Sequence, residues 1–241
     1  MNKQRSILSA AMLAMALSAS ASADTVVQWG FESPLTPADA TNFAVYPNAI
    51  APSIGSGNAS GVHANAATDW TTPVGNGSAN SFSSNTWTVG DYYQFQTSTT
   101  GFADVMLSWD QTSSSTGPRD FKLAYSTDGT GYTDFGSYSV LVNGTPNTAW
   151  TSATYNSAFN FAFDLSAITA LDNQANVFFR LTDTSTVSAN AGTVATAGTD
   201  RVDNFTVSAS VAAPIPEADT YALLLAGLGL VGFLARRRRV G

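Results

Sequence analysis

The sequence predicts an all-β domain, a jelly-roll-type antiparallel β-sandwich, set between two short hydrophobic ends. Short apolar and aromatic runs recur between turn-forming stretches, with no sustained helical period. Ser, Thr, Asn and Gly are abundant, and only 11% of the 241 residues are charged. This composition is typical of β-sandwiches and not of helical bundles.

The strand candidates are numerous and short enough to form two packed sheets. Asp128-Gly129-Thr130-Gly131 is a turn of the kind that joins antiparallel strands. The predicted strands cover 26–31, 92–96, 105–109, 121–126, 138–142, 159–165, 177–182 and 204–208. Residues 47–86 have a weaker apolar pattern and are expected to form long surface loops. A short helical turn, capped by Asp164 or Ser166, is expected around 165–171.

The charge of the middle of the chain excludes one class of partner. Residues 24–213 contain 15 acidic and four basic side chains, a net charge of -11. A domain this acidic repels phosphate backbones, so we expect no nucleic-acid binding. The absence of cysteine excludes disulfides, thiolate metal sites and thiol nucleophiles.

The N-terminus has the three parts of a secretory signal peptide. Lys3 and Arg5 precede an apolar run over 7–17, and Ala21-Ser22-Ala23 provides a small-residue cleavage site. The alternative is an N-terminal membrane anchor, but the apolar run is too short to span a bilayer. We therefore predict that residues 1–23 direct the chain to the secretion machinery and are removed by signal peptidase.

The C-terminal tail, residues 214–241, has the features of a membrane anchor. We predict a transmembrane helix over 220–235; its apolar part spans about 22 Å, somewhat less than the ~30 Å of a hydrocarbon core. The basic cluster 236–239 (Arg236, Arg237, Arg238 and Arg239) stops translocation, because arginines remain on the cytoplasmic side of the inner membrane. The domain at 24–213 is then outside the cytoplasm.

The order of parts in this tail resembles a known sorting signal. Pro216 and Glu217, a glycine-containing apolar helix and a terminal arginine cluster are together similar to the PEP-CTERM signal. The motif covers 216–219, with Ala218 where the family name expects proline. The resemblance implies recognition by an exosortase, a membrane cysteine protease-transpeptidase usually found in Gram-negative bacteria that make exopolysaccharide. The expected destination is the cell surface or extracellular matrix.

Three short motifs of the domain, at 29–32, 126–129 and 201–205, resemble jelly-roll modules of bacterial surface and carbohydrate-binding proteins. The resemblance implies that Glu32 and Asp203 lie near one structural calcium ion, which takes several oxygen ligands at once. The alternative is that both are solvated or hydrogen-bonded residues at strand ends.

Catalytic patterns are weak in this sequence. The single histidine, His63, lies in a Gly-Asn-Ala-rich stretch, which we interpret as a surface loop without a rigid base for a Ser-His-Asp hydrolase. Zinc-protease and nucleotide-binding motifs are absent. Paired carboxylates for glycoside hydrolysis are available as residue types at Asp104, Asp110, Asp120 and Asp134.

Aromatic side chains are the stronger functional signal, because flat rings stack on sugar faces. Trp109 is expected in the core, and either Tyr92 or Tyr93 must face inward. Trp70 and Trp150 are flanked by polar residues and are the candidates for ligand contact.

The sequence therefore predicts a non-catalytic, exosortase-sorted surface or matrix protein associated with exopolysaccharide. The alternatives are a carbohydrate-active enzyme of the glycoside hydrolase type and a purely structural adhesin without a sugar site.

Overall fold

The computed structural model describes residues 23–33, 35–37, 39–144, 147, 149–212, 225–230 and 236. The predicted signal peptide lies outside the described residues except for Ala23. The predicted sorting motif at 216–219 also lies outside them, together with most of the predicted transmembrane helix and all of the arginine cluster except Arg236.

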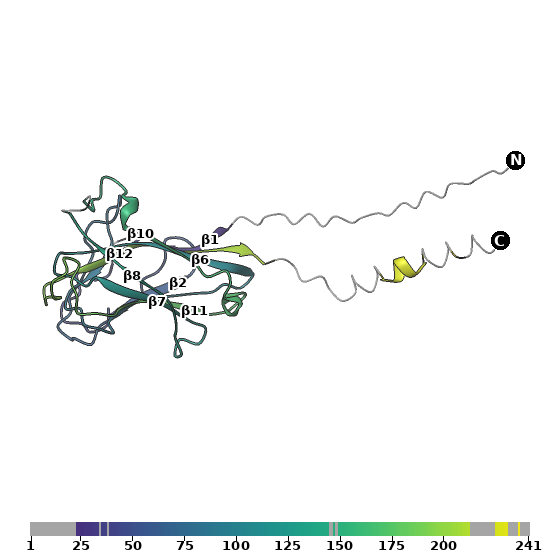
Figure 1. The fold of residues 1–241 in the computed structure, drawn as a ribbon, viewed down its shortest axis with the longest axis horizontal. Coiled ribbons are helices and arrows are strands. Elements are labelled where there is room, and N and C mark those ends of the chain that lie inside the picture. The colour runs from purple at the N-terminus through teal and green to yellow at the C-terminus, as the bar shows by residue number, and fades with distance from the viewer. Residues whose placement is uncertain are drawn as a thin grey trace.

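The described residues form two packed β-sheets, which confirms the all-β sandwich (Figure 1). Sheet A contains β1 (Asp24–Trp29), β3 (Trp70–Thr71), β4 (Phe82–Ser84), β6 (Phe102–Ser113), β9 (Leu141–Val142), β10 (Asn160–Asp164) and β12 (Asp200–Val211). Sheet B contains β2 (Gly57–Val62), β5 (Tyr92–Thr97), β7 (Asp120–Ser126), β8 (Thr133–Ser139) and β11 (Val177–Asp183).

The chain passes repeatedly from one sheet to the other, so strands distant in sequence become neighbours. Sheet A has the order β10-β6-β12-β4-β3, with β1 on β12 and β9 on β6. Sheet B has the order β2-β5-β11-β7-β8. The pairings are antiparallel except for β6 with β9.

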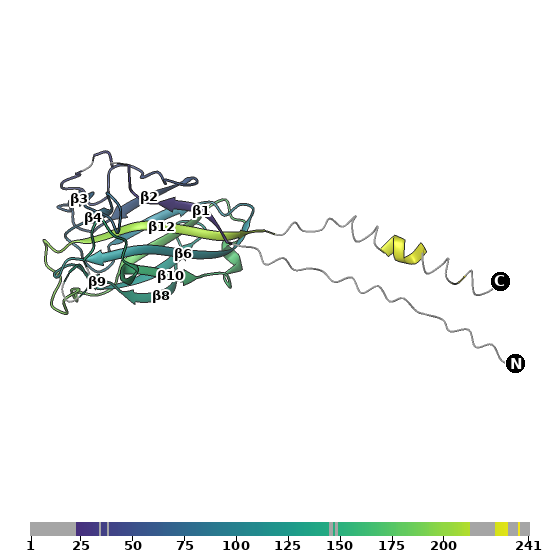
Figure 2. The ribbon, with the colours of Figure 1, turned by 90° about the horizontal axis from the view of Figure 1, so that it is seen from above.

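Both junctions with the predicted end segments lie at one end of the sandwich. Asp24 at the start of β1 is paired with Ala209 near the end of β12. Figure 2 shows the start of β1 and the end of β12 side by side, and Figure 1 agrees. A chain held at this end directs the opposite end and both sheet faces away from its attachment.

Aromatic rings join the two sheets across the core. Phe95 of sheet B and Phe205 of sheet A stack with ring centroids 3.6 Å apart and an interplanar angle of 1°. Trp29 packs against both rings. All three side chains are almost fully buried, and burying each contributes roughly 1.5–3 kcal/mol. The prediction that Trp109 is a core residue is also confirmed.

The expectation of long loops over 47–86 is wrong for β2, β3 and β4, which lie in this segment, whereas the stretches between these strands are loops and turns. Its glycines provide space for tryptophan rings. A Cβ at Gly61 would lie 2.0 Å from Cζ3 of Trp70, and one at Gly57 would lie 2.9 Å from Cζ2 of Trp29. Glycine inside a strand often marks such a close approach.

Gly61→Ala should lower the free energy of unfolding by about 1–3 kcal/mol, the usual cost of overpacking a core. The added methyl group would overlap a ring that is 0% exposed and cannot move aside. Urea denaturation followed by circular dichroism measures the change. Gly131→Ala is a matched control, because a Cβ there would lie 3.7 Å from its nearest neighbour.

The predicted helical turn at 165–171 is a short 3-10 helix, η2 (Thr169–Leu171). The predicted cap by Asp164 or Ser166 is wrong, because the N-cap residue is Ile168 and no side chain caps the helix. Asp164 Oδ1 instead accepts a hydrogen bond from Ser166 N before the helix begins. Another 3-10 helix, η1 (Ser157–Phe159), precedes β10. In the tail, residues 225–230 are helical. Within the described ranges, no helix has the length and hydropathy needed to span a bilayer.

Candidate functional site

The outer face of sheet B carries a cluster of half-buried polar and aromatic side chains. Side chains in β5 and β11 alternate between the core and this outer face. We define the sheet B face by its outward side chains on β2, β5, β7 and β11. In β5 and β11 these are Tyr92, Gln94, Gln96, Phe178, Arg180 and Thr182, all half-buried.

Arg180 is held between two tyrosine rings at the centre of this face. Its Cζ lies 4.0 Å from the ring centroid of Tyr92 and 3.7 Å from that of Tyr132. Arg180 Nε donates to Gln94 Oε1 at 2.8 Å, and the Tyr132 hydroxyl donates to the same oxygen at 2.8 Å. These contacts fix a half-buried guanidinium group that is stabilised by cation–π attraction to both rings.

Strand register and one turn bring these residues together. Gln94 and Arg180 are cross-strand partners in β5 and β11, and Tyr92 is opposite Thr182. Tyr132 comes from the turn between β7 and β8. Asp128 Oδ1 accepts hydrogen bonds from two backbone N–H groups of this turn, Thr130 and Gly131, and these bonds lower the pKa of Asp128.

Other cations of sheet B already have carboxylate partners. Arg119 pairs with Asp120 and Lys122 pairs with Asp134, each with an N–O distance of 2.9 Å. Within the described part of the chain, Arg180 has no carboxylate within 4.0 Å. The sheet B face therefore presents one fixed cation that no acidic side chain neutralises.

Trp70 and Trp150 were predicted to contact a ligand because their polar neighbours indicated exposed loops. That expectation of exposure is wrong, because both rings are buried. Trp70 is 0% exposed and stacks on Phe82, with its indole N–H donating to the Phe43 carbonyl at 2.7 Å. Trp150 is 3% exposed, and its N–H donates to the Val74 carbonyl at 2.7 Å. Polar neighbours in sequence suggested loops, but each indole N–H finds a backbone acceptor inside the fold. Neither ring presents a face to a ligand.

His63 is also buried, which corrects its interpretation as a surface residue. Its ring lies between Trp70 and Trp87, with centroids 4.8 Å and 4.3 Å away. The hydroxyls of Thr68 and Ser84 lie 3.2 Å from Nδ1 and Nε2, respectively. The Gly-Asn-Ala-rich sequence concealed strand β2, which ends just before this histidine and carries it into the core.

In space, His63 lies between Ser84 and Asp91, as the histidine does in a Ser-His-Asp triad. Its Nε2 is 3.2 Å from Ser84 Oγ, and its Nδ1 is 3.5 Å from Asp91 Oδ2. The three residues are 1%, 3% and 2% exposed, so a substrate has no access to the hydroxyl. Burial lowers the pKa of His63 to about 3 and outweighs a hydrogen bond with the backbone of Asn85, which acts in the opposite direction. Such an imidazole is a weak base at neutral pH, so we interpret the cluster as structural.

The residues predicted to bind calcium meet at the turn formed by residues 75–80. Asp203 is fully buried, and its Oδ2 accepts hydrogen bonds from Asn76 N at 2.9 Å and Ser78 Oγ at 2.7 Å. Glu32 Oε2 accepts from Ala79 N at 3.1 Å. The two carboxylates, 171 positions apart in the sequence, are therefore held by one turn.

Three oxygen atoms converge beside Gly75 in this turn. A Cβ at Gly75 would lie 1.8 Å from Ser78 Oγ and 2.3 Å from both the Asn80 carbonyl and Asp203 Oδ2. Burial raises the pKa of Asp203 to about 7, and the nearby charge of Asp110 adds to the rise. The hard oxygen donors suit calcium, although the described residues contain no group of three acidic, histidine or cysteine side chains placed to hold a metal.

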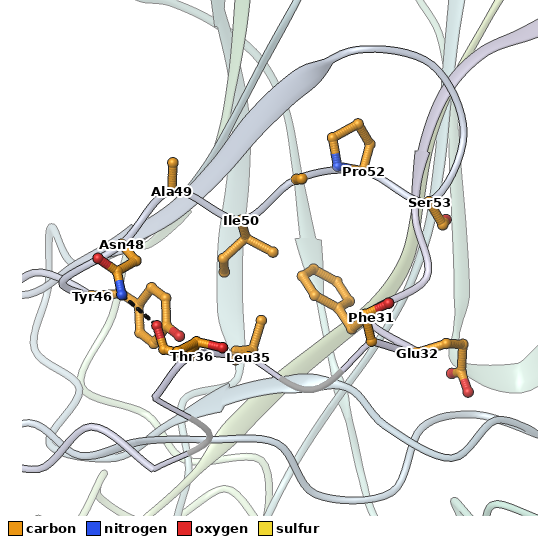
Figure 3. Close-up of a pocket in the computed structure, with 12 residues that line it drawn as sticks. Phe31, Glu32, Leu35, Thr36, Tyr46, Asn48, Ala49, Ile50, Pro52 and Ser53 are labelled. Atoms are coloured by element: carbon orange, nitrogen blue, oxygen red, sulfur yellow. Dashed lines mark hydrogen bonds between the residues drawn. The ribbon is translucent and has the colours of Figure 1, made fainter.

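A cavity of about 310 Å³ lies next to this turn, between residues 31–36 and 46–53. Figure 3 shows that Phe31, Leu35 and Ile50 form its apolar lining. The carboxylate of Glu32 is directed away from this lining in Figure 3 and bonds to Ala79. The cavity is therefore separate from the oxygen cluster beside Gly75.

The tail matches a family model. Residues 214–239 match the PEP-CTERM protein-sorting motif. This finding agrees with the resemblance of the tail and indicates an exported, membrane-anchored precursor that is sorted to the cell surface. No curated protein matches the chain significantly.

Comparison with solved structures finds several proteins of low sequence identity to this chain. One is the CBM22-1–GH10 part of endo-1,4-beta-D-xylanase 10B from Clostridium thermocellum, with 15% identity and a TM-score of 0.41; the match covers 80% of this chain and 30% of that one. Another is the CBM22-2 xylan-binding domain of Xyn10C from Paenibacillus barcinonensis, with 10% identity, a TM-score of 0.40 and coverages of 77% and 99%. The K3 cleaved adhesin domain of Lys-gingipain from Porphyromonas gingivalis has 10% identity, a TM-score of 0.38 and coverages of 76% and 98%.

Proposed function

We propose that this PEP-CTERM-sorted surface protein is non-catalytic and associates with exopolysaccharide through the sheet B face. The fixed cluster of Arg180, Tyr92, Tyr132 and Gln94 carries the proposal. It presents aromatic edges, amide groups and a cation on a rigid sheet, and such groups bond sugar hydroxyls with little loss of side-chain entropy.

A binding role is supported over glycoside hydrolysis by the surroundings of the candidate acids. Asp110 is 1% exposed and accepts hydrogen bonds from Asn160 and Asn204. Asp120 and Asp134 are paired with basic side chains. A glycosidase instead needs two carboxyl groups on opposite sides of one accessible bond.

Tyr132→Ala should weaken glycan binding by about tenfold or more, because the loss of one ring frees the guanidinium and removes a ligand contact. The measurement is binding of the full-length protein, purified in mild detergent, to an array of neutral and acidic polysaccharides. Tyr155→Ala is the matched control, since Tyr155 is 53% exposed and lies beside Gly77, away from the sheet B face.

The same preparations are assayed for release of reducing sugar. Binding without release supports the proposal. Release of reducing ends would establish the enzyme alternative, and the absence of binding to every glycan would favour a structural adhesin.

We also propose that an exosortase cleaves the tail at the Pro216-Glu217 motif after insertion into the membrane. Intact mass of the protein recovered from its native host should then show loss of the apolar segment and of Arg236–Arg239. Changing Pro216 and Glu217 to alanine should block cleavage but preserve insertion, because the apolar segment and arginines drive insertion. A wild-type species that still ends at Gly241 would contradict this proposal.

A structural calcium ion bound by Glu32 and Asp203 is the remaining part of the proposal. It is supported by the oxygen cluster beside Gly75 and by the buried Asp203 carboxylate, whose charge a cation would offset. An ion that binds only the folded state raises stability by about 2.7 kcal/mol at ~100 Kd.

Chelation should therefore lower the melting temperature of the wild-type protein, and added calcium should restore it. Asp203→Asn should remove this response, while Asp104→Asn, a change at an exposed aspartate outside the cluster, should retain it. An equal response to chelator in wild type and Asp203→Asn would exclude this site.

A further inference from the structure

We infer that the ligand of the sheet B face is an acidic polysaccharide, and that Arg180 receives one of its carboxylates. This inference rests on the proposed function and specifies its ligand. It follows from the geometry of the guanidinium group, the charges on the face and the charge of the whole domain.

The geometry leaves Arg180 one way to meet a ligand. The rings of Tyr92 and Tyr132 both pack on its guanidinium group, and Nε is bonded to Gln94. The edge carrying the two Nη atoms is the part that remains for an incoming group. Two parallel N–H donors on this edge match the two oxygens of a planar carboxylate.

The charge on the face also favours an anion. Within the described chain, Lys122 and Arg119 are neutralised by Asp134 and Asp120, whereas Arg180 has no acidic partner within 4.0 Å. The whole segment 24–213 carries a net charge of -11. Three of its four basic residues nevertheless lie in sheet B or at its edge. Asp128, in the turn that carries Tyr132, adds a negative charge, but its Oδ1 is bonded to the backbone of that turn. Within the described part of sheet B, Arg180 is therefore the cation left to pair with a negative ligand.

The domain charge limits which anions bind. Double-stranded nucleic acid carries about one charge per 1.7 Å of helix axis, a density that the acidic domain repels. A polyuronate carries one carboxylate on each sugar, and at about 0.15 M salt those carboxylates that lie more than ~8 Å from the acidic side chains of the domain are largely screened from them. One carboxylate can then pair with Arg180 while sugar hydroxyls reach Gln94, Gln96 and Ser60, whose strands are neighbours.

The test uses the full-length protein in mild detergent and three probes at about 0.15 M salt. The probes are polygalacturonate, its fully methyl-esterified form and poly-L-glutamate. We expect binding to polygalacturonate only, because the ester lacks the charge and the polypeptide lacks sugar hydroxyls.

Arg180→Gln should weaken polygalacturonate binding about 10- to 100-fold, the range for losing hydrogen bonds to a charged group. Arg180→Lys should restore only part of the affinity, because an ammonium group lacks the planar fork. Arg119→Gln, which removes a cation that precedes β7, lies outside the four strands of the face and is already paired with Asp120, should change binding less than about twofold. Unchanged circular dichroism spectra and melting temperatures verify the fold of each variant.

The outcomes separate this inference from the proposed function. Equal binding of the acid and the ester, weakened by Tyr132→Ala, would retain a glycan-binding face and overturn the role of the carboxylate. Equal binding of poly-L-glutamate would overturn the assignment to a polysaccharide. A loss in Arg119→Gln as large as that in Arg180→Gln would overturn the specific role of Arg180, and no binding of any probe would overturn the inference.

Discussion

Trp70→Ala should lower the free energy of unfolding by about 3–5 kcal/mol, the usual cost of removing a large buried aromatic side chain. The ring is 0% exposed, stacks on Phe82 at 5.2 Å and meets the edge of His63 at 4.8 Å. Gly61 lies against it on β2 and has no side chain to fill the resulting cavity. Urea denaturation monitored by circular dichroism measures the loss.

A double-mutant cycle with Gly61→Ala tests whether the glycine and the ring are coupled. In the Trp70→Ala background, Gly61→Ala should cause little further loss in the free energy of unfolding, because the ring that the added methyl group would overlap is absent. Val89→Ala, at a side chain that is 55% exposed, should change stability by less than about 0.5 kcal/mol. A loss below about 1 kcal/mol in Trp70→Ala would contradict the proposed packing.

Strands in which apolar and polar residues alternate were predictable from sequence, whereas the glycine-rich strand β2 was not. β5 reads Tyr-Tyr-Gln-Phe-Gln-Thr, and its buried positions follow directly from the period of two. β2 reads Gly-Asn-Ala-Ser-Gly-Val, and its glycines are required by rings from elsewhere in the chain. Local patterning does not contain that information, so the segment resembled a loop.

The candidate sites, like the strands, were only partly predictable from sequence. Tyr92, Tyr132 and Arg180 come from separate segments, and only the register of β5 with β11 places Gln94 opposite Arg180. Sequence reasoning therefore missed this cluster, although the scarcity of basic residues was a signal that each one mattered. The resemblance to carbohydrate-binding modules implied that Glu32 and Asp203 lie close together. It did not identify the turn at 75–80, whose residues bond to both carboxylates.

His63→Gln should change how stability depends on pH, with an effect as large as that of Trp70→Ala. Burial between Trp70 and Trp87 lowers the pKa of His63 to about 3 in the folded protein, from an ordinary value of 6.5. Between these values the unfolded chain binds a proton that the folded chain does not. The wild-type protein therefore loses stability from this group as pH falls, by about 1.4 kcal/mol per pH unit and about 4–5 kcal/mol in total.

The measurement is urea denaturation of wild type and His63→Gln at pH 7, 6, 5 and 4, analysed as the difference between the two proteins. Buried acids such as Asp183, whose pKa burial raises to about 7, act in the opposite direction, but they contribute equally to both proteins and cancel. Wild type should lose stability relative to the variant by about 1.4 kcal/mol for each unit below pH 6. Asp183→Asn provides the reverse control: because only the wild-type protein must bury a charge at high pH, the variant should gain relative stability as pH rises from 4 to 7. Parallel curves for wild type and His63→Gln would contradict the lowered pKa of His63 and would mean that its imidazole binds protons equally well in the folded and unfolded protein.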